Sequence, residues 1–559
     1  MILTPRETIK EYTEKGYWRE TTLLDDFKQN VRRFPERTAV VDPPNKESLM
    51  GLKPERITYK ELSRAADAVA TSLVRKMGIK KDDFIVMQMP NCWELAMLYI
   101  AIARAGAIAS PLPVQWRQKE FNYIANITEA KAFITVEDFH GFKHLEMGKE
   151  MQSRLPNLKY LLSLKDLGEM IKGDADSEKL DQVKTDPNDI FFVEWTSGTE
   201  KDAKGCPMSH NNWYAQSNMF LELYECRMGD IMLMTAPLVN MTAGTGYIPW
   251  IRTAGTLVLH HPFDAVILIQ QIMEERPDRT LMVPALLNMI LKHPKVGDFD
   301  FSSLRMIVTG SAPPSIYSMQ EFKRRWGVEI LNNWGQNEGT NLISGPVTTP
   351  LELRADHIPQ FGKKGAKWPC EAFFRGIETK VVDSSGKELT EQGEVGELLY
   401  KSPSVIPCYL KRPDMTKSAF EPDGFFHTGD LFQIKENDYV NYFDRKKDII
   451  IRGGFNISAQ EVENMLLANA RVADVAAVAM PDEIMGEKVC VYIVPRPGET
   501  LTLEDVTSYV KEQGIAVYKF PERLEIIDAI PRNPVGKILK TKLREDLKAK
   551  MAKEGKLKK

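Results

Sequence analysis

Short apolar runs alternate with helix-length segments over the first 310 residues of this chain. Residues 85–89 (IVMQM) precede a helical pattern over 93–104 that ends before Gly106, and residues 108–112 form the next apolar run. Two strands joined by one helix pair most readily in parallel, with the helix packed on the sheet. Similar apolar runs recur at residues 132–136, 231–234, 256–259, 281–283 and 306–309. The pattern therefore predicts an α/β fold built on helix-covered parallel sheets.

The length of 559 residues exceeds what one hydrophobic core organises, so we expect at least two domains. From about residue 369, short strands and turns replace the strand–helix alternation, which predicts a barrel-like β-rich subdomain over 369–444. A charged run at 444–448 (DRKKD) then precedes a compact unit of mixed strands and helices. We predict a large N-terminal domain over 1–444 and a small, mobile α+β C-terminal domain over 448–559.

Composition and charge exclude several classes of function. The formal net charge is −3 and 43% of the residues are hydrophobic, so nothing attracts the chain to nucleic acid or to an anionic membrane. The six cysteines are scattered without CxxC spacing and are expected to be reduced thiols. The first residues lack the apolar core of a signal peptide, and Arg104 and Gly106 interrupt the most apolar stretch. We expect a cytoplasmic protein without an integral membrane segment that acts on small molecules.

A loop rich in hydroxyl, glycine and lysine residues follows the apolar run at residues 190–193. It spans residues 195–205 (WTSGTEKDAKG), and the backbone N–H groups and hydroxyls of such a loop can converge on phosphate oxygens. Its spacing differs from the Gly-x-x-x-x-Gly-Lys-Ser/Thr nucleotide loop, and a plain surface turn has the same composition. Taken alone, the loop leaves a phosphate site and a turn as alternatives.

Two further stretches of the N-terminal domain carry small, aromatic and acidic residues. Residues 310–313 (GSAP) are small enough to let a flat ring lie against the backbone, although a tight strand–helix turn uses the same residues. Residues 332–338 (NNWGQNE) place the aromatic Trp334 near Glu338. A carboxylate suits Mg²⁺, which prefers oxygen ligands and usually takes one or two protein carboxylates beside phosphates. The alternative for Glu338 is an exposed acid at the start of a helix.

Three charged residues nearer the C-terminus stand in specific contexts. Asp430 ends residues 423–430 (DGFFHTGD), and Arg445 follows it fifteen residues later. An ionised aspartate is a strong acceptor for hydroxyl groups. Lys537 lies within residues 531–539 (PRNPVGKIL), where a lysine on a flexible stem can neutralise developing negative charge. The alternative for this lysine is a solvated surface position.

In this order, the motifs resemble those of the adenylate-forming superfamily, which includes acyl-CoA synthetases, adenylation domains and luciferases. The resemblance covers residues 57–537, and its nearest match is to members that activate aryl and alicyclic acids. The phosphate loop departs from the family pattern at Glu200, Lys201 and Ala203. The function that the resemblance implies therefore depends more on the other motifs than on this loop.

The resemblance assigns roles to individual residues. Glu338 would bind Mg²⁺, and Asp430 and Arg445 would bind the ribose hydroxyls of the nucleotide. The implied catalytic residues are Thr196, Glu338 and Lys537. The implied ATP- and AMP-binding residues are Thr196, Ser197, Gly198, Thr199, Lys204, Gly310, Ser311, Ala312, Pro313, Asn333, Trp334, Gly335, Gln336, Asn337, Asp430 and Arg445.

The resemblance also implies a two-step reaction that uses ATP, Mg²⁺ and coenzyme A. A substrate carboxylate attacks the α-phosphate of ATP to give acyl-AMP and pyrophosphate, and the CoA thiol then attacks the acyl group and releases AMP. Between the steps, the C-terminal domain is expected to rotate about a hinge at 445–447, with Lys447 as its pivot, and to withdraw Lys537. Glycines suit a narrow thiol channel because they lack a Cβ atom. The implied CoA-binding residues are Gly453, Gly454 and Phe455.

The implied acyl pocket favours a compact acid. Aryl-acid activators carry an asparagine that recognises an ortho-hydroxyl where this chain has Met241, so dihydroxybenzoate and salicylate are disfavoured. Gly335 replaces the tryptophan of acetyl-CoA synthetases and leaves room for larger acids. We expect a carbocyclic acid, similar to benzoate or to cyclohexane- or cyclohexenecarboxylate, with linear medium-chain acids as the alternative. The implied pocket residues are Asn240, Met241, Thr242, Gly244, Gly310 and Gly335.

Two other functions stay open at this point. A stand-alone adenylating enzyme that loads a carrier protein would share the first step and the thiol channel. A degenerate, non-catalytic protein that binds nucleotide or acyl groups is a second alternative, because Glu200 places an acid in the phosphate loop. The sequence does not tell whether the reaction runs toward acyl-CoA or toward ATP. It also leaves open whether the protein is a monomer or a homodimer.

Overall fold

The chain divides into two compact units. The computed structural model describes residues 1–196, 203–239, 241–310, 314–369, 375–513, 516–533 and 537–555, without the side chains of residues 242, 243 and 456. The first unit comprises residues 1–379 with 400–426, and the second comprises residues 380–399 with 427–559. The stretch over 369–444 is therefore shared between the two units.

An eight-stranded sheet organises one half of the first unit. All neighbouring strands pair in parallel except β1 with β2 and β13 with β14, which are antiparallel. The strand order is β14 (Thr340–Ser344), β13 (Glu329–Gln336), β12 (Met306–Thr309), β11 (Arg279–Leu281), β9 (Ile231–Met234), β10 (Thr256–Leu259), β1 (Thr38–Val41) and β2 (Arg56–Thr58). The predicted runs at 231–234, 256–259 and 306–309 are strands of this sheet.

A six-stranded sheet organises the other half, and it is parallel except for the antiparallel pair β7–β8. Its order is β6 (Tyr160–Leu162), β5 (Ala132–Thr135), β3 (Phe84–Gln88), β4 (Ile108–Pro111), β7 (Ile190–Trp195) and β8 (Gly205–Ser209). The helix α5 (Trp93–Arg104) connects the parallel strands β3 and β4. The prediction of helix-covered parallel sheets is confirmed.

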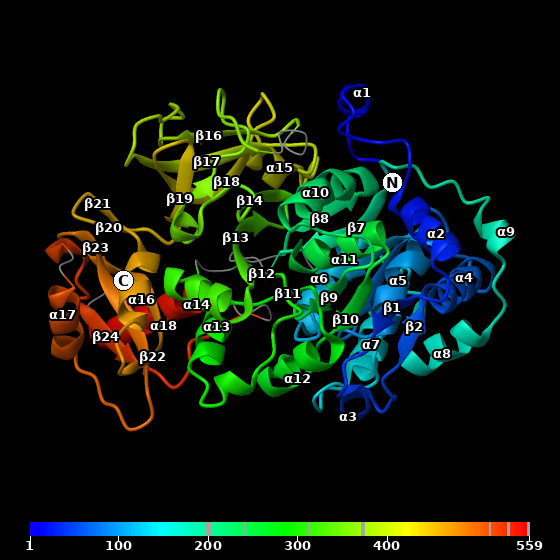
Figure 1. The fold of residues 1–559 in the computed structure, drawn as a ribbon, viewed down its shortest axis with the longest axis horizontal. Coiled ribbons are helices and arrows are strands. Elements are labelled where there is room, and N and C mark those ends of the chain that lie inside the picture. The colour runs from blue at the N-terminus through cyan, green and yellow to red at the C-terminus, as the bar shows by residue number, and fades with distance from the viewer. Residues whose placement is uncertain are drawn as a thin grey trace. The chain divides into compact units, whose positions relative to one another are not determined.

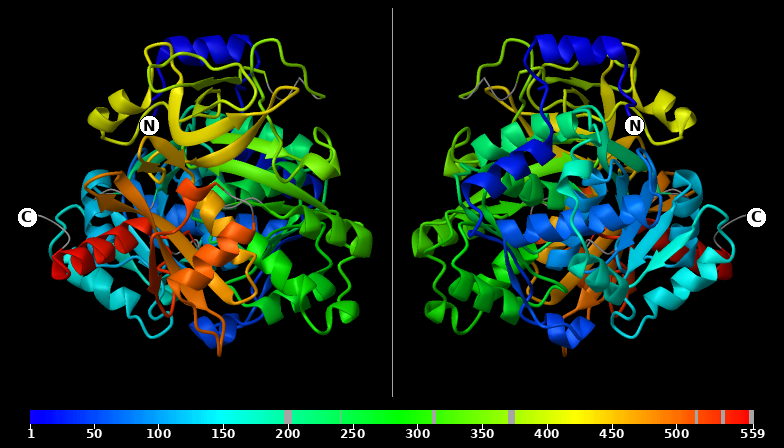
Figure 2. Two further views of the ribbon diagram at one scale, coloured as in Figure 1. Left: turned by 90° about the vertical axis from the view of Figure 1, so that its left-hand side faces the viewer. Right: turned by 90° about the vertical axis from the view of Figure 1, so that its right-hand side faces the viewer.

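Helices cover the sheets of the first unit (Figures 1 and 2). All residues of α5 are buried, because this helix contacts β1 of the larger sheet and β7 of the smaller one. The remaining helices of this unit are α1 (Arg6–Glu14), α2 (Leu23–Arg33), α3 (Lys46–Met50), α4 (Tyr59–Arg75), α6 (Gln118–Thr128), α7 (His144–Gln152), α8 (Leu164–Lys172), α9 (Ser177–Leu180), α10 (His210–Leu223), α11 (Met241–Thr253), α12 (Ala265–Glu275), α13 (Pro284–Leu291), α14 (Ile316–Trp326) and α15 (Pro413–Ala419), with a short strand β15 (Ile358–Pro359). Among the residues that the structure describes, no helix combines the length and the apolar character needed to cross a membrane.

In the part of the second unit that the structure describes, strands of two sheets are combined with the α-helices α16, α17 and α18. Most residues of β16 (Glu378–Val382), β17 (Val395–Lys401), β18 (Phe426–Ile434) and β19 (Tyr439–Arg445) belong to it, and these strands are neighbours in the order β19-β18-β17-β16. In the other sheet the order is β21-β20-β23-β22, and β24 pairs with β23. These elements are β20 (Ile450–Arg452), β21 (Phe455–Ile457), β22 (Val472–Asp482), β23 (Gly486–Pro495), β24 (Arg523–Ile526), α16 (Ala459–Leu467), α17 (Leu503–Glu512) and α18 (Lys540–Lys553).

A fully buried ion cluster stabilises the first unit. Lys46 Nζ lies 2.7 Å from Asp42 Oδ2 and 2.8 Å from Glu94 Oε1, and its side chain has no exposed surface. Asp42 Oδ1 also accepts a hydrogen bond from the backbone N–H of Trp93, the first residue of α5. Burial, reinforced by the charge of Glu94, raises the pKa of Asp42 to about 6. The lysine thus places a positive charge between two buried carboxylates, and it counteracts the burial that disfavours the charged form of Asp42.

Replacement of Lys46 should therefore destabilise the protein strongly. The substitution Lys46→Met leaves two buried carboxylates without a cation, and we expect the free energy of unfolding to fall by about 3–5 kcal/mol. Urea unfolding of the full chain, followed by tryptophan fluorescence, measures this change. Lys10→Met removes an exposed lysine that pairs with Glu14 and is the matched control. Equal unfolding midpoints for the two variants would show that the cluster contributes little.

Candidate functional site

The turn between β13 and β14 places Glu338 in a buried position. Glu338 has only 9% of its surface exposed. Tyr409 donates a hydrogen bond from its hydroxyl to Glu338 Oε1 at 2.7 Å, and Ile406 N donates to the Glu338 carbonyl at 3.0 Å. The segment that contains both partners, residues 403–410, is called the clasp segment below. Because the clasp segment holds both its backbone and its side chain, the Glu338 carboxylate has a fixed position.

Gly339 connects this turn directly to the clasp segment. Ser404 Oγ donates to the Gly339 carbonyl at 2.6 Å. The φ angle of Gly339 is +93°, and a Cβ atom at this position would lie 2.0 Å from the Ser404 carbonyl oxygen. Only glycine fits this conformation and this contact.

Thr196 and Lys204 form the base of the predicted phosphate loop. Thr196 N donates to the Lys204 carbonyl at 3.0 Å, and Lys204 N donates to Thr196 Oγ1 at 3.3 Å. Lys204 Nζ lies 5.1 Å from the centroid of the Tyr409 ring, within range of a cation–π interaction. Tyr409 thus contacts both Lys204 and Glu338, which are 134 positions apart in the sequence. The remaining predicted loop residues, Ser197, Gly198 and Thr199, lie outside the described residues.

Tyr409 is a site residue that the sequence motifs missed. It stands in residues 405–410 (VIPCYL), which match none of the motifs. The backbone N–H of Leu410 donates to the Gly205 carbonyl at 2.9 Å, so the clasp segment also fixes the strand that leaves the loop. Only this long-range pairing brings the tyrosine to the site, and no local pattern predicts it.

Glu194 is a second missed residue. It lies in β7, two positions before Thr196, and neither of its carboxylate oxygens has a hydrogen-bond partner among the residues that the structure describes. Burial raises the pKa of Glu194 well above its ordinary value, and the negative charge of Glu338 raises it further. The protonated, neutral form of Glu194 is therefore favoured. In that form it adds no second negative charge beside Glu338.

The hairpin also gathers predicted residues of the acyl pocket. Asn333 and Gly335 lie on one face of β13, and Gly335 is in register with Asn341 of β14. A Cβ atom on Gly335 would lie 2.1 Å from Asn341 Nδ2, so this close approach also requires glycine. Asn337 Oδ1 accepts a hydrogen bond of 3.2 Å from the backbone N–H of Met241 at the start of α11. The structure thus brings Met241 to the strand that carries the predicted nucleotide residues.

Other predicted residues of the first unit lie near the same strands. Gly310 directly follows β12, and a Cβ atom there would lie 3.3 Å from the Asn333 carbonyl. Gly244 lies against the ring of Trp213 of α10. Trp334 and Gln336 lie in β13 in register with Leu342 and Thr340. Ser311, Ala312, Pro313, Asn240 and the side chain of Thr242 lie outside the described part of the chain.

In the second unit, Asp430 and Arg445 face each other across a hairpin. They are register partners of the antiparallel strands β18 and β19, and Arg445 Nε lies 3.8 Å from Asp430 Oδ1. Thr428 Oγ1 accepts a hydrogen bond from Asp430 N and donates one of 2.7 Å to the Leu398 carbonyl. Only 5% of the surface of Asp430 is exposed. The fifteen-residue spacing therefore produces a direct side-chain pair.

The remaining predicted residues of the second unit lie outside its helices, with Phe455 at the start of β21. Lys447 offers its carbonyl to Arg544 Nη2 at 3.2 Å. Gly453 and Gly454 form the turn between β20 and β21, with φ angles of +56° and +87°, and the Phe455 ring stacks on Tyr518. Lys537 is exposed, and its backbone N–H donates to Asn533 Oδ1 at 2.8 Å. Its side chain is therefore accessible.

The side chains around Glu338 could supply only part of the ligands of a Mg²⁺ ion. Within the described ranges, no group of three or more His, Cys, Asp or Glu side chains could hold a metal ion. A Mg²⁺ ion at Glu338 would therefore take phosphate oxygens and water as its other ligands, which is how this ion is commonly bound beside nucleotides.

Comparison with known proteins gives consistent matches over both units. The family model for AMP-binding enzymes matches residues 27–410, and the model for the C-terminal domain of AMP-binding enzymes matches residues 461–537. A medium-chain fatty-acid–CoA ligase of Escherichia coli K12 is 30% identical, over 97% of this chain and 93% of the relative. A 2,3-dihydroxybenzoate–AMP ligase of Bacillus subtilis 168 is 28% identical, over 98% and 97% of the two chains.

Solved structures share the fold. The ATP-bound structure of MatB from Rhodopseudomonas palustris has a TM-score of 0.79 and 24% identity, with 95% of this chain and 99% of that chain covered. The anthranilate–CoA ligase AuaEII, solved with anthranoyl-AMP, has a TM-score of 0.81 and 21% identity, with 95% and 98% covered.

The close contact at Gly339 predicts that replacement of this glycine destabilises the protein. Gly339→Ala forces the turn away from Ser404, and we expect the melting temperature to fall further than it does in Gly365→Ala. Gly365 is the matched control, because its φ angle is +87° and a Cβ atom there would meet nothing within 4 Å. Gly365→Ala should lower the free energy of unfolding only by the strain of a non-glycine residue in the left-handed conformation, about 1–2 kcal/mol. Equal melting temperatures for the two variants would contradict the contact.

Proposed function

This chain belongs to the AMP-binding enzyme family, within the adenylate-forming superfamily, and we propose that it joins a carboxylic acid to coenzyme A. The proposed substrate is a carbocyclic or medium-chain acid. The observation that carries the proposal is the contact of Tyr409 with both Lys204 and Glu338. A lysine and a carboxylate thus lie beside one aromatic ring, and we propose them as the cation for phosphate oxygens and the ligand for Mg²⁺.

In the proposed first step, a carboxylate oxygen of the acid attacks the α-phosphorus of ATP. The bond from that phosphorus to the bridging oxygen breaks, pyrophosphate leaves with its electron pair, and acyl-AMP remains. Lys204 and the Thr196 hydroxyl bind phosphate oxygens. Glu338 would hold Mg²⁺, which would supply positive charge to neutralise the phosphates. Lys537 neutralises charge at the reacting carboxylate and α-phosphate. Phosphoryl transfer depends mostly on such positioning and charge neutralisation.

In the proposed second step, the sulfur of coenzyme A attacks the acyl carbon of acyl-AMP. A carbon–sulfur bond forms, the thiol proton is released, and AMP leaves. Gly453 and Gly454 are proposed to line the thiol channel, and Lys447 is proposed as the pivot between the steps. Asp430 and Arg445 are proposed to bind the ribose hydroxyls, because the buried aspartate, held beside the arginine, offers carboxylate oxygens that can accept hydrogen bonds from hydroxyl groups.

A screen for products tests this function. Candidate acids are incubated with Mg²⁺, ATP and coenzyme A, and both pyrophosphate exchange and thioester formation are measured. Exchange and thioester formation with the same acid would support an acid–CoA ligase. The absence of exchange with every carbocyclic and linear acid would contradict it and favour a non-catalytic binding protein.

A second candidate function is a stand-alone adenylating enzyme that loads a carrier protein. It is favoured by the 28% identity to the dihydroxybenzoate–AMP ligase over nearly the whole chain. Such an enzyme would perform the exchange but would form no thioester with free coenzyme A.

Lys537 should act in the first step only. We expect Lys537→Ala to lower carboxylate-dependent pyrophosphate exchange about 100-fold or more, as removal of one charge-stabilising group commonly does. Thioester formation from synthetic acyl-AMP and coenzyme A should change much less. Lys542→Ala, an exposed lysine of α18, is the matched control. Equal losses in both half-reactions would contradict the assigned role.

Tyr409 should position the carboxylate that binds Mg²⁺. Tyr409→Phe keeps the ring near Lys204 but removes the hydroxyl that donates to Glu338, and we expect about a 10-fold higher Mg²⁺ concentration for half-maximal exchange. The exchange rate at saturating Mg²⁺ should fall less. Tyr317→Phe, at a tyrosine with 60% of its surface exposed, is the control. An unchanged Mg²⁺ dependence would show that the hydrogen bond does not position the carboxylate.

A further inference from the structure

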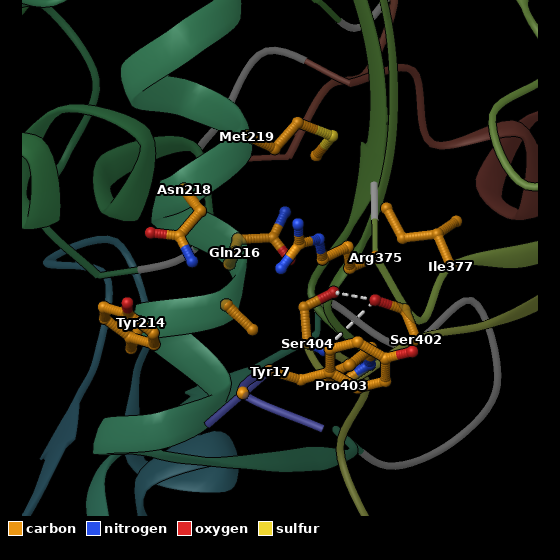
Figure 3. A pocket seen from close by; sticks show the side chains of 12 residues that line it. Tyr17, Tyr214, Gln216, Asn218, Met219, Arg375, Ile377, Ser402, Pro403 and Ser404 are labelled. Carbon is orange, nitrogen blue, oxygen red and sulfur yellow. Dashed lines mark hydrogen bonds between the residues drawn. The ribbon is translucent and has the colours of Figure 1, made fainter. Parts of the chain in front are cut away.

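The first unit has a polar cavity of about 220 Å³ beside α10 that stands apart from the proposed reaction (Figure 3). Tyr17, Tyr214 and Arg375 are among its lining residues, and none of the described residues that we predict to bind nucleotide, acid or coenzyme A lines it. Gln216 also lines this cavity, but its amide donates to Asn341. A contact of the second unit, in contrast, bears directly on the proposed reaction.

Asp444, the next-to-last residue of β19, caps a helix that lies beyond the proposed pivot. Its Oδ2 accepts a hydrogen bond of 3.1 Å from the backbone N–H of Gln460 and one of 3.0 Å from Ser458 Oγ. Ser458 Oγ also lies 2.9 Å from the Phe443 carbonyl oxygen, so its one hydrogen is shared between two acceptors of β19. Ser458 is itself the N-cap of α16, because its Oγ accepts from Glu461 N at 3.1 Å. Asp444 and Ser458 thus bind N–H groups of the first turn of α16 that have no partner within the helix.

Helix α16 belongs to the part of the second unit that follows the pivot, residues 448–559, called the C-terminal part below. Val462 and Leu466 of this helix pack in one core with strands β22 and β23. Asp444 belongs to the preceding sheet, because β19 pairs with β18, where Leu431 is its register partner. The cap therefore joins the sheet before the pivot to the domain core after it, and only 3% of Asp444 and 1% of Ser458 are exposed.

Hydrogen bonds anchor the backbone on both sides of the pivot. Before it, Lys446 N donates to the Gly429 carbonyl at 3.0 Å. After it, Arg544 of α18 holds the Lys447 carbonyl at 3.2 Å and Asp448 Oδ1 at 2.5 Å. While both anchors stay intact, the C-terminal part can rotate only about the backbone angles of Lys446 and Lys447.

Such a rotation breaks the cap. Asp444 moves with β19, whereas Ser458 and Gln460 move with the C-terminal part, so hydrogen bonds of 3.0 and 3.1 Å do not survive a large turn. The carboxylate and the first turn of α16 would then both need other partners, and the favourable interaction of the carboxylate with the helix N-terminus would be lost. Removal of the cap therefore makes it easier to leave the arrangement seen here, without any change at Lys447.

We propose that the cap formed by Asp444 and Ser458 is a latch that holds the C-terminal part in this arrangement and sets the balance between the two half-reactions. This inference rests on the proposed function, because the rotation about Lys447 is part of it. Asp444 and Ser458 are positioning residues, since they act through the arrangement of the C-terminal part and not on the substrate.

Two variants remove the latch in different ways. Ser458→Ala removes the hydroxyl that joins α16 to β19. Asp444→Asn keeps the volume of the side chain but leaves one acceptor oxygen in place of two, and Asp444 Oδ1 already accepts from Arg445 N at 2.7 Å. The asparagine therefore cannot serve both sides, and this variant keeps the test valid even where Ser458→Ala does not fold. Thr502→Ala is the matched control, because Thr502 is the N-cap of α17 and its side chain bonds to Asp505 within the same turn.

Distances within the second unit test the latch without any substrate. Spin labels are attached at two exposed positions, Lys387 between β16 and β17 and Lys511 of α17, through unnatural amino acids that spare the six cysteines. We expect Ser458→Ala and Asp444→Asn to raise the population of a second distance about 5-fold, as the loss of one helix cap allows. Thr502→Ala should leave the distance distribution of the parent protein unchanged.

The half-reactions give a second readout. If each step uses its own arrangement, loss of the latch changes the ratio of pyrophosphate exchange to thioester formation from synthetic acyl-AMP, and we expect a change of about 5-fold. A merely structural defect would lower both steps together and preserve this ratio, as Thr502→Ala should.

The outcomes separate this inference from the proposed function. An unchanged distance distribution in both latch variants would overturn the inference, and so would a second distance that appears with an unchanged ratio of the half-reactions. The absence of both half-reactions in the parent protein would contradict the proposed function instead. The distance measurement would still decide in that case whether the cap holds the C-terminal part.

Discussion

The contact of the clasp segment with the β13–β14 turn is the constraint on which the candidate site depends. A glutamate in a hairpin turn is usually solvated and free to adopt several rotamers. Here Tyr409 holds the Glu338 carboxylate, Ile406 holds its backbone, and Ser404 fixes the next residue. The same segment pairs with Gly205 at the end of the predicted phosphate loop. One stretch of chain thus fixes two elements that the sequence separates widely.

The contact brings together three ionisable side chains, Glu194, Glu338 and Lys204. Glu194 lies close enough to Glu338 to sense its charge, and two buried carboxylates would repel each other. Burial resolves the conflict by favouring the neutral form of Glu194. Lys204 lies against the Tyr409 ring rather than against the carboxylate. The lysine charge therefore remains available for an anion.

Local sequence patterns predicted the strands well where a strand coincides with an uninterrupted apolar run. Residues 231–234, 256–259 and 306–309 are strands as expected, whereas the run at 281–283 begins two residues earlier, because Arg279 and Thr280 pair with β9 and β12. The division into two sheets was not predictable, since strand order depends on contacts between distant segments. Tyr409 and Glu194 were missed because both depend on tertiary structure. Tyr409 reaches the site through a long-range hydrogen bond, and Glu194 is affected by its burial.

A chain of buried amides lies beside the glycine that the sequence assigns to the acyl pocket. A methionine at position 241 and a glycine at position 335 indicate an apolar pocket for a ring or an alkyl chain. Beside Gly335, Asn341 donates hydrogen bonds to Asn333 Oδ1 and to the Trp334 carbonyl, and it accepts one from Gln216. A buried amide is costly unless its groups are hydrogen-bonded, so these bonds hold the Asn341 side chain in place. Because a Cβ atom on Gly335 would meet that side chain, a larger residue at position 335 would disturb this network as well as the predicted pocket.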